Sequence, residues 1–365
     1  MTAARFAIIG AGAGGLAMAG QLALLGCDVA LFNRTAERIS AVEKRGGVTL
    51  TGAVEGTGRI GIASSDIREV VVEADVIVVI VPAFAHRDVA RICGPHLRDG
   101  QTVLLMPGRT GGAIEFARIL EELEIRVDVR IAETQTILHT CRASSHEAEV
   151  TVFSVKQHVP VASLPASEKD AVLELVRPIL PQFTKAESVL ATSMGNVGAI
   201  LHPAPTLLNT GWIETMRTKF LHYYEGITPS VAGFLEQMDR ERLEVANAMG
   251  VAVLSTKEWL EDVYRAHGAT LYDTIQRTDA YQEIYAPQSI QHRYIYEDVP
   301  TGLVPMASFG DVMHVDTPCL DLVIDIASRI CGVDFNAQGR TVETLGLASL
   351  DTEGLRRFVE NGGRR

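Results

Sequence analysis

The chain has 365 residues, of which 47% are hydrophobic and 21% charged, and its formal net charge at pH 7 is −12. A chain of this length exceeds the size at which one hydrophobic core stops growing, so the sequence predicts two domains. The acidic balance argues against a general binder of nucleic-acid phosphates. No apolar run approaches the roughly 18 residues that span a bilayer, which argues against a membrane protein.

The N-terminus and the cysteines bear on cellular location. A strand-like segment follows Met1 after three small residues, without the basic and apolar regions of a signal peptide. The five cysteines are scattered without CxxC spacing, which suits reduced thiols better than a disulfide framework or a zinc site. The sequence therefore predicts a cytoplasmic protein without a metal.

The first half of the chain alternates β-branched runs with amphipathic stretches, the pattern of parallel strands joined by crossover helices. Strands are expected over residues 5–9, 28–32, 76–81, 102–106, 129–133 and 150–154, and a helix over residues 167–180. This pattern predicts a doubly wound Rossmann domain over residues 1–187.

Helical patterns dominate the second half, for example over residues 231–249 and 317–330. We therefore expect an all-α substrate or catalytic domain over residues 188–365. The segment 286–305 is rich in Pro, Tyr, His and charged residues and fits neither period, so we interpret it as an ordered loop of the kind that carries catalytic groups.

A GxGxxG motif directly follows the first expected strand and begins an apolar helix. Gly10 permits the tight turn, Gly12 lets the backbone approach a pyrophosphate, and Gly15 lets helix and strand pack closely. The helix N-terminus attracts the anion. The motif predicts dinucleotide binding; the alternative is a glycine-rich turn without a ligand.

The residues after the second strand bear on the choice of cofactor. An acidic residue there would accept from the ribose 2′-hydroxyl and repel a 2′-phosphate. This chain has Asn33, Arg34 and Thr35 instead, with Arg38 one turn further on. An amide, a guanidinium and a hydroxyl suit a phosphate, so NADP(H) is favoured over NAD(H). The alternative is that Arg34 and Arg38 are solvated surface charges.

Two proline turns follow the third and fourth strands. Pro82 comes after the strand that ends at Val81, and Pro107 with Gly108 comes after the next one. Ligands bind at the carboxyl ends of such strands, so we expect these turns to flank the nicotinamide ribose, unless they serve chain reversal only.

Four long motifs together resemble the octopine/nopaline (opine) dehydrogenase family. They are PGRTGGA at 107–113, NVGAILHP at 196–203, YYEGITPS at 223–230 and RYIYEDVPTGLVP at 293–305. The resemblance covers almost the whole chain. It implies a Rossmann domain followed by an α-helical domain, and reductive condensation of an amino acid's amine with a 2-keto acid using NADH or NADPH.

The resemblance also implies a catalytic constellation of His202, Arg293 and Asp298. A histidine suits proton transfer near neutral pH. Asp298 would orient the imidazole and stabilise its cation. Arg293 would clamp a substrate carboxylate, and with Arg109 it would make the site locally positive despite the acidic chain.

Further candidates surround this constellation. Asn196 is a candidate for a hydrogen bond to substrate or cofactor, or else a structural cap, while Tyr223, Tyr224 and Glu225 are expected to line the substrate pocket or to pack in the core. His292 is a rival to His202 as proton donor. Pro203 biases His202 away from helical geometry and marks a helix start.

Other readings remain open. One alternative is an NADP-dependent carbonyl reductase of the 2-ketoacid or ketopantoate type, and another is a non-catalytic NADP-binding sensor. His139 and Cys141 lack further ligands at suitable spacing, so a metal site there is rejected. The expected partners are an amino acid and a 2-keto acid, and a homodimer is expected from the general frequency of dimers among soluble enzymes.

Overall fold

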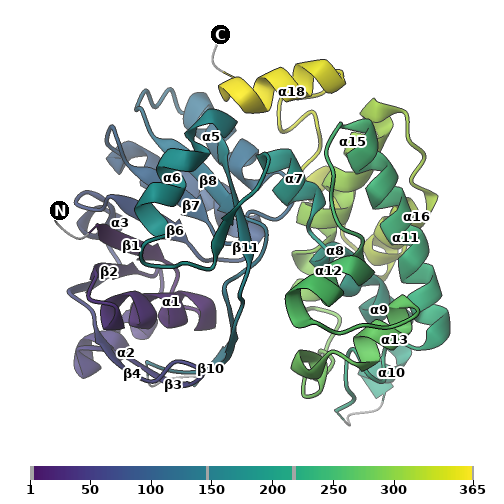
Figure 1. Cartoon of the computed structure of the whole chain (residues 1–365), viewed down its shortest axis with the longest axis horizontal. Coiled ribbons are helices and arrows are strands. Elements are labelled where there is room, and N and C mark those ends of the chain that lie inside the picture. Colours follow the sequence, from purple (N-terminus) through teal and green to yellow (C-terminus); the bar gives the residue numbers. More distant parts are fainter. Residues whose placement is uncertain (1–3, 145–147, 216–218, 364–365) are drawn as a thin grey trace. The chain divides into compact units, whose positions relative to one another are not determined.

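The computed structural model describes residues 4–144, 148–215 and 219–363. The chain folds into two compact units (Figure 1). Unit 1 consists of Met1–Gly108, Gly112–Thr192 and Phe358–Arg365, and unit 2 consists of Arg109–Gly111 and Ser193–Arg357. A three-residue segment that directly follows a turn of unit 1 therefore belongs to unit 2.

The main sheet of unit 1 has the Rossmann arrangement. Within the described residues, eight strands follow the order β12-β11-β8-β7-β6-β1-β2-β5, and only the β8–β11 pair is antiparallel. The strands are β1 (Arg5–Ile9), β2 (Asp28–Phe32), β5 (Ile62–Ser64), β6 (Val76–Val79), β7 (Thr102–Leu105), β8 (Arg130–Thr134), β11 (Val159–Leu164) and β12 (Phe183–Lys185). The strand order reverses beside β1, and ligands bind at such a switch point.

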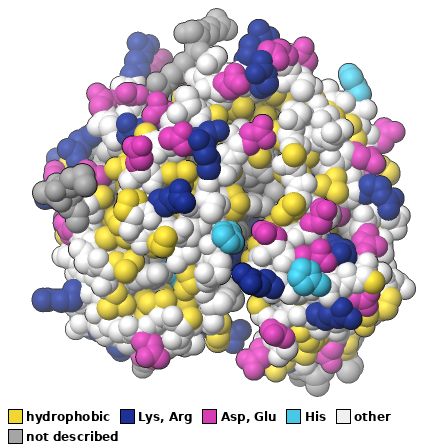
Figure 2. Space-filling model, in the orientation of Figure 1, with side chains coloured by type: hydrophobic (Ala, Val, Ile, Leu, Met, Phe, Trp, Pro, Cys, Tyr) yellow, Lys and Arg dark blue, Asp and Glu magenta, His cyan; other side chains and the backbone are white. Residues whose placement is uncertain are grey.

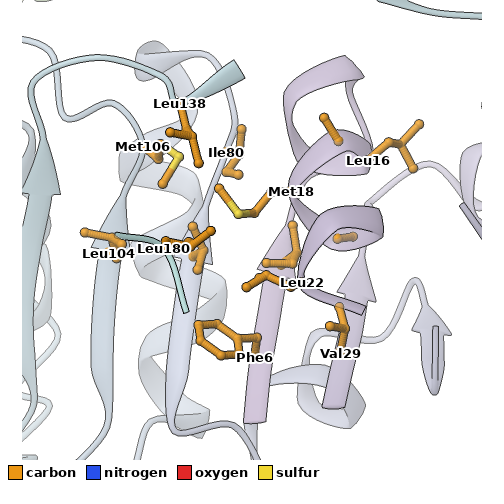
Figure 3. Close-up of a cluster of buried hydrophobic side chains, with 14 of the residues drawn as sticks. Phe6, Leu16, Met18, Leu22, Val29, Ile80, Leu104, Met106, Leu138 and Leu180 are labelled. Carbon is orange, nitrogen blue, oxygen red and sulfur yellow. The ribbon is translucent and has the colours of Figure 1, made fainter. Parts of the chain in front are cut away.

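Helices cover both faces of this sheet, as the alternating pattern predicts. They are α1 (Ala13–Leu24), α2 (Ala36–Arg45), α3 (Ile67–Val71), α4 (His86–Cys93), α5 (Gly112–Glu122), α6 (Lys169–Val176) and α7 (Val189–Met194), the last of which ends in unit 2. Short 3₁₀ turns are η1 (Ala83–Ala85), η2 (Gly94–His96) and η3 (Ala166–Glu168). Met18 and Leu22 of α1 pack in one buried cluster with Phe6 and Ile80, which fixes α1 against the sheet (Figure 3).

A second, smaller sheet packs on α1 and was not predicted. Its strands, in the order β4-β3-β10-β9, are β4 (Gly56–Arg59), β3 (Gly47–Gly52), β10 (Glu149–Val155) and β9 (His139–Ala143). A Cβ at Gly20 of α1 would lie 3.0 Å from Leu50, so the small residue admits this sheet. The strand expected at 150–154 therefore exists but belongs to the second sheet.

Unit 2 is helical, which confirms the predicted fold class. Its helices are α8 (Gly198–Leu201), α9 (Pro203–Leu208), α10 (Thr210–Thr215), α11 (Pro229–Ala248), α12 (Thr256–Tyr264), α13 (Leu271–Gln276), α14 (Arg293–Tyr296), α15 (Val304–Met313), α16 (Pro318–Cys331), α17 (Phe335–Gln338) and α18 (Thr352–Asn361), which ends in unit 1. A 3₁₀ turn, η4 (Asp279–Tyr281), and a π-helix, η5 (Val299–Leu303), complete it.

Arg242 of α11 anchors the start of unit 2. Its side chain is fully buried, pairs with Asp239 at 2.7 Å, and donates to the carbonyl oxygens of Met194 and Leu254. Asp239 in turn accepts from the backbone and hydroxyl of Thr256. This buried ion pair fixes the backbone two residues before Asn196.

Three expectations of secondary structure are wrong. The segment 286–305 is largely helical from Arg293 onward, because α14, η5 and the start of α15 follow one another there. The helix expected over 167–180 extends only from Lys169 to Val176. His202 has helical dihedral angles (φ −109°, ψ −57°), although Pro203 does begin a helix.

The described helices include none that is long and apolar enough to cross a membrane. Acidic and basic side chains are interspersed over the visible face (Figure 2).

Candidate active site

The glycine loop of unit 1 has the shape that a pyrophosphate requires. Gly10 has φ +115°, and a Cβ there would lie 2.4 Å from the Ile80 carbonyl oxygen. A Cβ at Gly15 would lie 1.7 Å from the Gly10 carbonyl oxygen, whereas one at Gly12 would meet no atom within 4 Å. Gly12 precedes α1 and provides no side-chain cap for its first amides. The loop thus fits a dinucleotide, because the open space at Gly12 lies beside uncapped backbone amides of α1 that can bind a phosphate.

Asn33 holds this loop in place. Its Oδ1 accepts from the Ala11 amide at 3.0 Å, and its Nδ2 donates to the Thr35 carbonyl oxygen at 3.1 Å. Arg38 donates to the Ala11 carbonyl oxygen at 3.4 Å. Arg34, Thr35 and Arg38 are exposed. The Asn33 side chain is therefore bonded to the backbone, Arg38 reaches the glycine loop, and Arg34 is exposed beside them.

The two proline turns have different surroundings. Pro82 is exposed and precedes η1, where its carbonyl oxygen accepts from the Ala85 amide at 2.8 Å. Gly108 lies against the buried carboxylate of Glu133, which also accepts from the Ala113 amide at 2.8 Å and from the Thr192 hydroxyl. Glu133 is a structural carboxylate of unit 1 that the sequence did not indicate.

In unit 2 the helix junctions bring His202 and Asp298 together. His202 lies between α8 and α9, and Asp298 directly precedes η5. Nδ1 of His202 is 2.9 Å from Oδ2 of Asp298, whose side chain is fully buried, whereas His202 is 17% exposed. A buried carboxylate on one ring nitrogen favours the tautomer with its proton on Nδ1 and leaves Nε2 as an acceptor.

Arg109 is the second partner of Asp298. Its Nη1 lies 3.2 Å from Oδ1 of Asp298, and its Nε lies 3.3 Å from Oε1 of Glu297. Burial alone would raise the pKa of Asp298, but Arg109 and then His202 outweigh it and lower the pKa to about 2. Burial also disfavours the charge of Arg109, yet the two carboxylates outweigh burial and raise its pKa. Asp298 and Arg109 therefore both remain charged at neutral pH.

The backbone of Arg109 is held in a left-handed conformation, with φ +58°. The Thr110 amide donates to the Thr301 carbonyl oxygen at 3.1 Å, and Arg340 donates to the Thr110 carbonyl oxygen at 3.1 Å. Ser193 accepts from the Gly111 amide at 2.9 Å. These bonds determine the position of the arginine, and such uncommon backbone states concentrate at functional sites.

Arg293 occupies the rim of the same cluster. Its side chain is 52% exposed, and its Nε lies 2.9 Å from Oε2 of Glu297. Glu297 thus bridges Arg109 and Arg293. Arg109 and Arg293 were expected to make the site positive, but the buried carboxylates of Glu297 and Asp298 balance their charges. The expectation of a locally positive site is therefore corrected.

Aromatic rings enclose His202. Tyr294 stacks on its ring with centroids 4.1 Å apart, and the Tyr223 hydroxyl lies 3.1 Å from Nε2. Burial, followed by neighbouring tyrosines, raises the pKa of Tyr223 well above its usual range, so the phenol stays protonated. Tyr223 therefore contacts the histidine itself, consistent with its expected place at the site.

The two other histidines nearby have lowered pKa values. Burial, then His202, lowers the pKa of His222 to about 3, and its Nε2 lies 3.2 Å from the Leu201 carbonyl oxygen. Burial, then Arg293, lowers the pKa of His292, whose Nδ1 accepts from the Tyr294 amide at 3.3 Å. His292 thus caps α14, whereas His202 has the carboxylate partner.

Two other candidates have structural partners. Asn196 is buried; its Oδ1 accepts from Arg109 at 3.2 Å and its Nδ2 donates to Thr110 at 3.4 Å, so it supports the arginine. Glu225 is exposed and accepts from the Leu221 amide at 2.5 Å within its own turn. The structure does not bring Glu225 to the His202 cluster.

The sequence did not indicate the central role of Arg109 or the places of Glu297 and Tyr294. The available signals were the long PGRTGGA motif and the position of both other residues inside the RYIYEDVP motif. No spacing rule connects residue 109 with residues 297 and 298, because only the tertiary fold brings them together.

The residues considered for a metal lie on β9. Burial lowers the pKa of His139 to about 4, and its ring bonds to Gln21. Burial raises the pKa of Cys141 to about 11. In the described part of the chain, no three His, Cys, Asp or Glu side chains are grouped to hold a metal ion.

Comparisons with known proteins identify the family of the chain. Residues 185–331 match the family described as NAD/NADP octopine/nopaline dehydrogenase, alpha-helical domain, and residues 6–108 match ketopantoate reductase PanE/ApbA. An opine dehydrogenase from Arthrobacter sp. (strain 1C) is 41% identical over 356 residues, covering 97% of this chain and 98% of the relative. Octopine dehydrogenase from Pecten maximus is 23% identical, covering 73% of this chain and 72% of that one.

Solved structures share the fold. Octopine dehydrogenase in complex with NADH and agmatine has a TM-score of 0.82 at 20% identity, with 99% of this chain and 98% of that chain covered. NADP⁺-bound yersinopine dehydrogenase has a TM-score of 0.74 at 15% identity, with the same coverage. Together with the 41% identical relative, these likenesses show that the chain belongs to the opine dehydrogenase family of NAD(P)-dependent oxidoreductases.

Proposed function

We propose that this protein is an opine dehydrogenase that condenses the amine of an amino acid with a 2-keto acid and reduces the product with NADPH, and that it also catalyses the reverse oxidation. The observation that carries the proposal is the His202–Asp298 pair, 2.9 Å apart, with its carboxylate fully buried. Residues 1–187 would serve as the cofactor domain and residues 188–365 as the substrate domain.

The chemistry needs one proton from solution. An ammonium group, a keto acid, NADPH and one proton give a protonated secondary amine, NADP⁺ and water, so atoms and charge balance. The bound nicotinamide supplies the hydride. His202 would give a proton to the departing hydroxyl during condensation and take one from the secondary amine in reverse. Asp298 would orient the ring and balance the imidazolium charge.

Arg293 would bind a substrate carboxylate. Its Nε contacts Glu297 and half of the side chain is exposed, so its guanidinium would accept a substrate carboxylate at the exposed edge. Arg109 has less freedom because it is buried among Glu297, Asp298 and Asn196. We therefore assign the clamp to Arg293 and the support of Asp298 to Arg109.

The preference for NADPH rests on the exposed cations next to the glycine loop. Arg34 and Arg38 flank Thr35, and the sequence provides no carboxylate at position 33. The variant Arg34→Ala should weaken NADPH binding by about 1.5–3 kcal/mol, the range for charge-assisted hydrogen bonds, and leave NADH binding unchanged; Arg38 is kept because it also bonds the glycine loop. Nucleotide fluorescence titration measures both affinities without turnover; equal losses for the two cofactors would contradict the assignment.

The decisive experiment follows NADPH absorbance with pyruvate and pooled amino acids, and omits the amines in a control. Pyruvate is a reasonable first keto acid because a solved octopine dehydrogenase structure contains it. We expect oxidation only when an amine is present, and its loss in His202→Ala. Oxidation without an amine would support a carbonyl reductase instead, the candidate that the ketopantoate reductase match over residues 6–108 favours.

A homodimer and a cytoplasmic location remain proposals. Sedimentation equilibrium of the purified protein tests the first, and fractionation of the native cell tests the second.

A further inference from the structure

The Tyr223 hydroxyl lies beside the ring nitrogen of His202 that the proposed function uses. Asp298 holds Nδ1 at 2.9 Å, and the phenol oxygen of Tyr223 lies 3.1 Å from Nε2. Tyr294 covers one face of the imidazole, with ring centroids 4.1 Å apart. A substrate oxygen that bonds to Nε2 must therefore also meet the Tyr223 hydroxyl.

The surrounding chain holds Tyr223 in this place. The amide of the preceding residue, His222, donates to the Ile284 carbonyl oxygen at 2.8 Å. The Tyr281 ring stacks on the Tyr223 ring with centroids 3.8 Å apart and planes 10° apart. Tyr223 is only 4% exposed, so its ring and its hydroxyl oxygen are fixed by packing and the O–H bond alone can rotate freely.

The hydrogen bond between the phenol and the imidazole depends on the charge of the imidazole. A neutral ring with its proton on Nδ1 accepts at Nε2, so the Tyr223 hydroxyl donates to it. A protonated ring donates from both nitrogens, so the O–H bond of Tyr223 must then turn away from Nε2. Burial, first among the causes, raises the pKa of Tyr223 well above its usual range, so the phenol keeps its hydrogen. The acid form of His202 thus presents an N–H and an O–H donor whose heavy atoms lie 3.1 Å apart.

We propose that Tyr223 is a second catalytic residue, whose phenol donates a hydrogen bond to the reacting oxygen of the 2-keto acid while Nε2 of His202 donates to the same oxygen. The inference deepens the proposed function and rests on it. Two donors about 3 Å apart can both bond to one oxygen, as in an oxyanion hole.

The phenol acts without losing its proton. In the carbinolamine the C–O bond breaks as the nitrogen lone pair forms the C=N bond, and the oxygen leaves as water with the proton from Nε2. Tyr223 stabilises the negative charge that develops on this oxygen and keeps its own O–H bond throughout.

Other donors near His202 have different partners. Arg109 is paired with two buried carboxylates. Nε2 of His222 is directed to a backbone carbonyl oxygen at 3.2 Å, and Nδ1 of His292 accepts from a backbone amide. In the described structure the hydrogen bond at Nε2 comes from Tyr223.

The test removes the phenol oxygen and compares two small acids that differ in their carbonyl oxygen. Tyr223→Phe keeps the ring and removes the donor, and Tyr285→Phe is the control, because it removes a hydroxyl from a ring that is 47% exposed. The full-length variants are assayed for kcat and KM with NADPH, pyruvate and an amine that supports wild-type turnover. Oxamate and propionate are then measured as inhibitors against pyruvate, because oxamate has the carbonyl oxygen of a 2-keto acid and propionate lacks it.

Tyr223→Phe should lower kcat at least about tenfold, because loss of one donor to a developing oxyanion costs about 10²–10³-fold in enzymes. The inhibition constant of oxamate should rise about three- to tenfold, the effect of one hydrogen bond, while that of propionate stays within about twofold. Tyr285→Phe should match the wild type in all of these constants. A tyrosine that only supported the His202 ring would change the two inhibition constants together.

A kcat of Tyr223→Phe within about tenfold of the wild type, or equal changes in the two inhibition constants, would overturn the assignment. Failure of the proposed function is a separate outcome, because the wild-type enzyme itself would then show no amine-dependent oxidation.

Discussion

Replacing Asp298 by asparagine should disable His202 by changing its tautomer. The substitution keeps the size of the side chain and turns one carboxylate oxygen into an NH₂ group. Arg109 lies 3.2 Å from Oδ1 and can only donate hydrogen bonds, so the side-chain oxygen of the new asparagine will stay directed at Arg109. The NH₂ group then faces Nδ1 of His202, 2.9 Å away, which must accept. The ring proton moves to Nε2, where the base is needed.

The same change in a Ser-His-Asp triad lowers kcat about 10⁴-fold, or about 5 kcal/mol of barrier. We expect a loss of similar size in the oxidation of the secondary amine, where His202 must accept a proton. Folding should survive, because Arg109 keeps Glu297 at 3.3 Å and Asn196 at 3.2 Å.

The assay measures kcat for NADP⁺ reduction by the condensation product, with thermal unfolding as the check on folding. Glu297→Gln is the control for the loss of one negative charge from the cluster, because this carboxylate contacts Arg109 and Arg293. A folded Asp298→Asn enzyme that retains more than about a tenth of wild-type kcat would refute the tautomer argument.

Three further predictions concern the cofactor loop and stability. Gly12→Val should abolish nucleotide binding and leave the thermal unfolding midpoint unchanged, because the new side chain fills only the space of the ligand. Gly15→Ala should both abolish nucleotide binding and lower the midpoint, because its Cβ would lie 1.7 Å from the Gly10 carbonyl oxygen. Arg242→Met should cost about 3–5 kcal/mol in urea unfolding by leaving Asp239 buried without its cation, and a loss below about 1 kcal/mol would contradict this. Because the pKa of Asp298 is lowered to about 2 from 3.8, its stabilisation is complete above pH 3.8 and is lost as pH falls through about 2, so the stability difference between wild type and Asp298→Asn should shrink over that window.

Periodicity and motif context were sufficient for the fold class and the cofactor loop. Strands such as β6 and β7 are buried along their whole length, so their β-branched and leucine-rich runs are distinct in the sequence. The glycine loop is local, because its strand, turn and helix are consecutive. The second sheet was missed because β3 and β4 are glycine-rich and because β3 pairs with β10, about 100 residues away in the sequence.

The site was only partly predictable for a related reason. The family motifs pointed to His202, Asp298 and Tyr223, which the fold brings into contact. Arg109 is 189 residues from Asp298 in sequence, and neither composition nor spacing reports such a contact. The helical character of residues 293–303 was hidden because a π-helix and one-turn helices lack the 3.6-residue repeat.

The charge balance of the cluster suggests how substrate binding and proton transfer are connected. Arg109 and Arg293 are matched by Glu297 and Asp298, so the two arginines and two carboxylates together add no net charge beside His202. A keto acid bound at Arg293 would add one negative charge, which favours the protonated form of His202. By linkage, protonation of His202 favours binding of the anion to the same degree. Binding of the keto acid, whose condensation requires a general acid, would thus favour the protonated imidazolium of His202. The KM for the keto acid should therefore rise with pH, and the KM for NADPH should not rise in parallel with it.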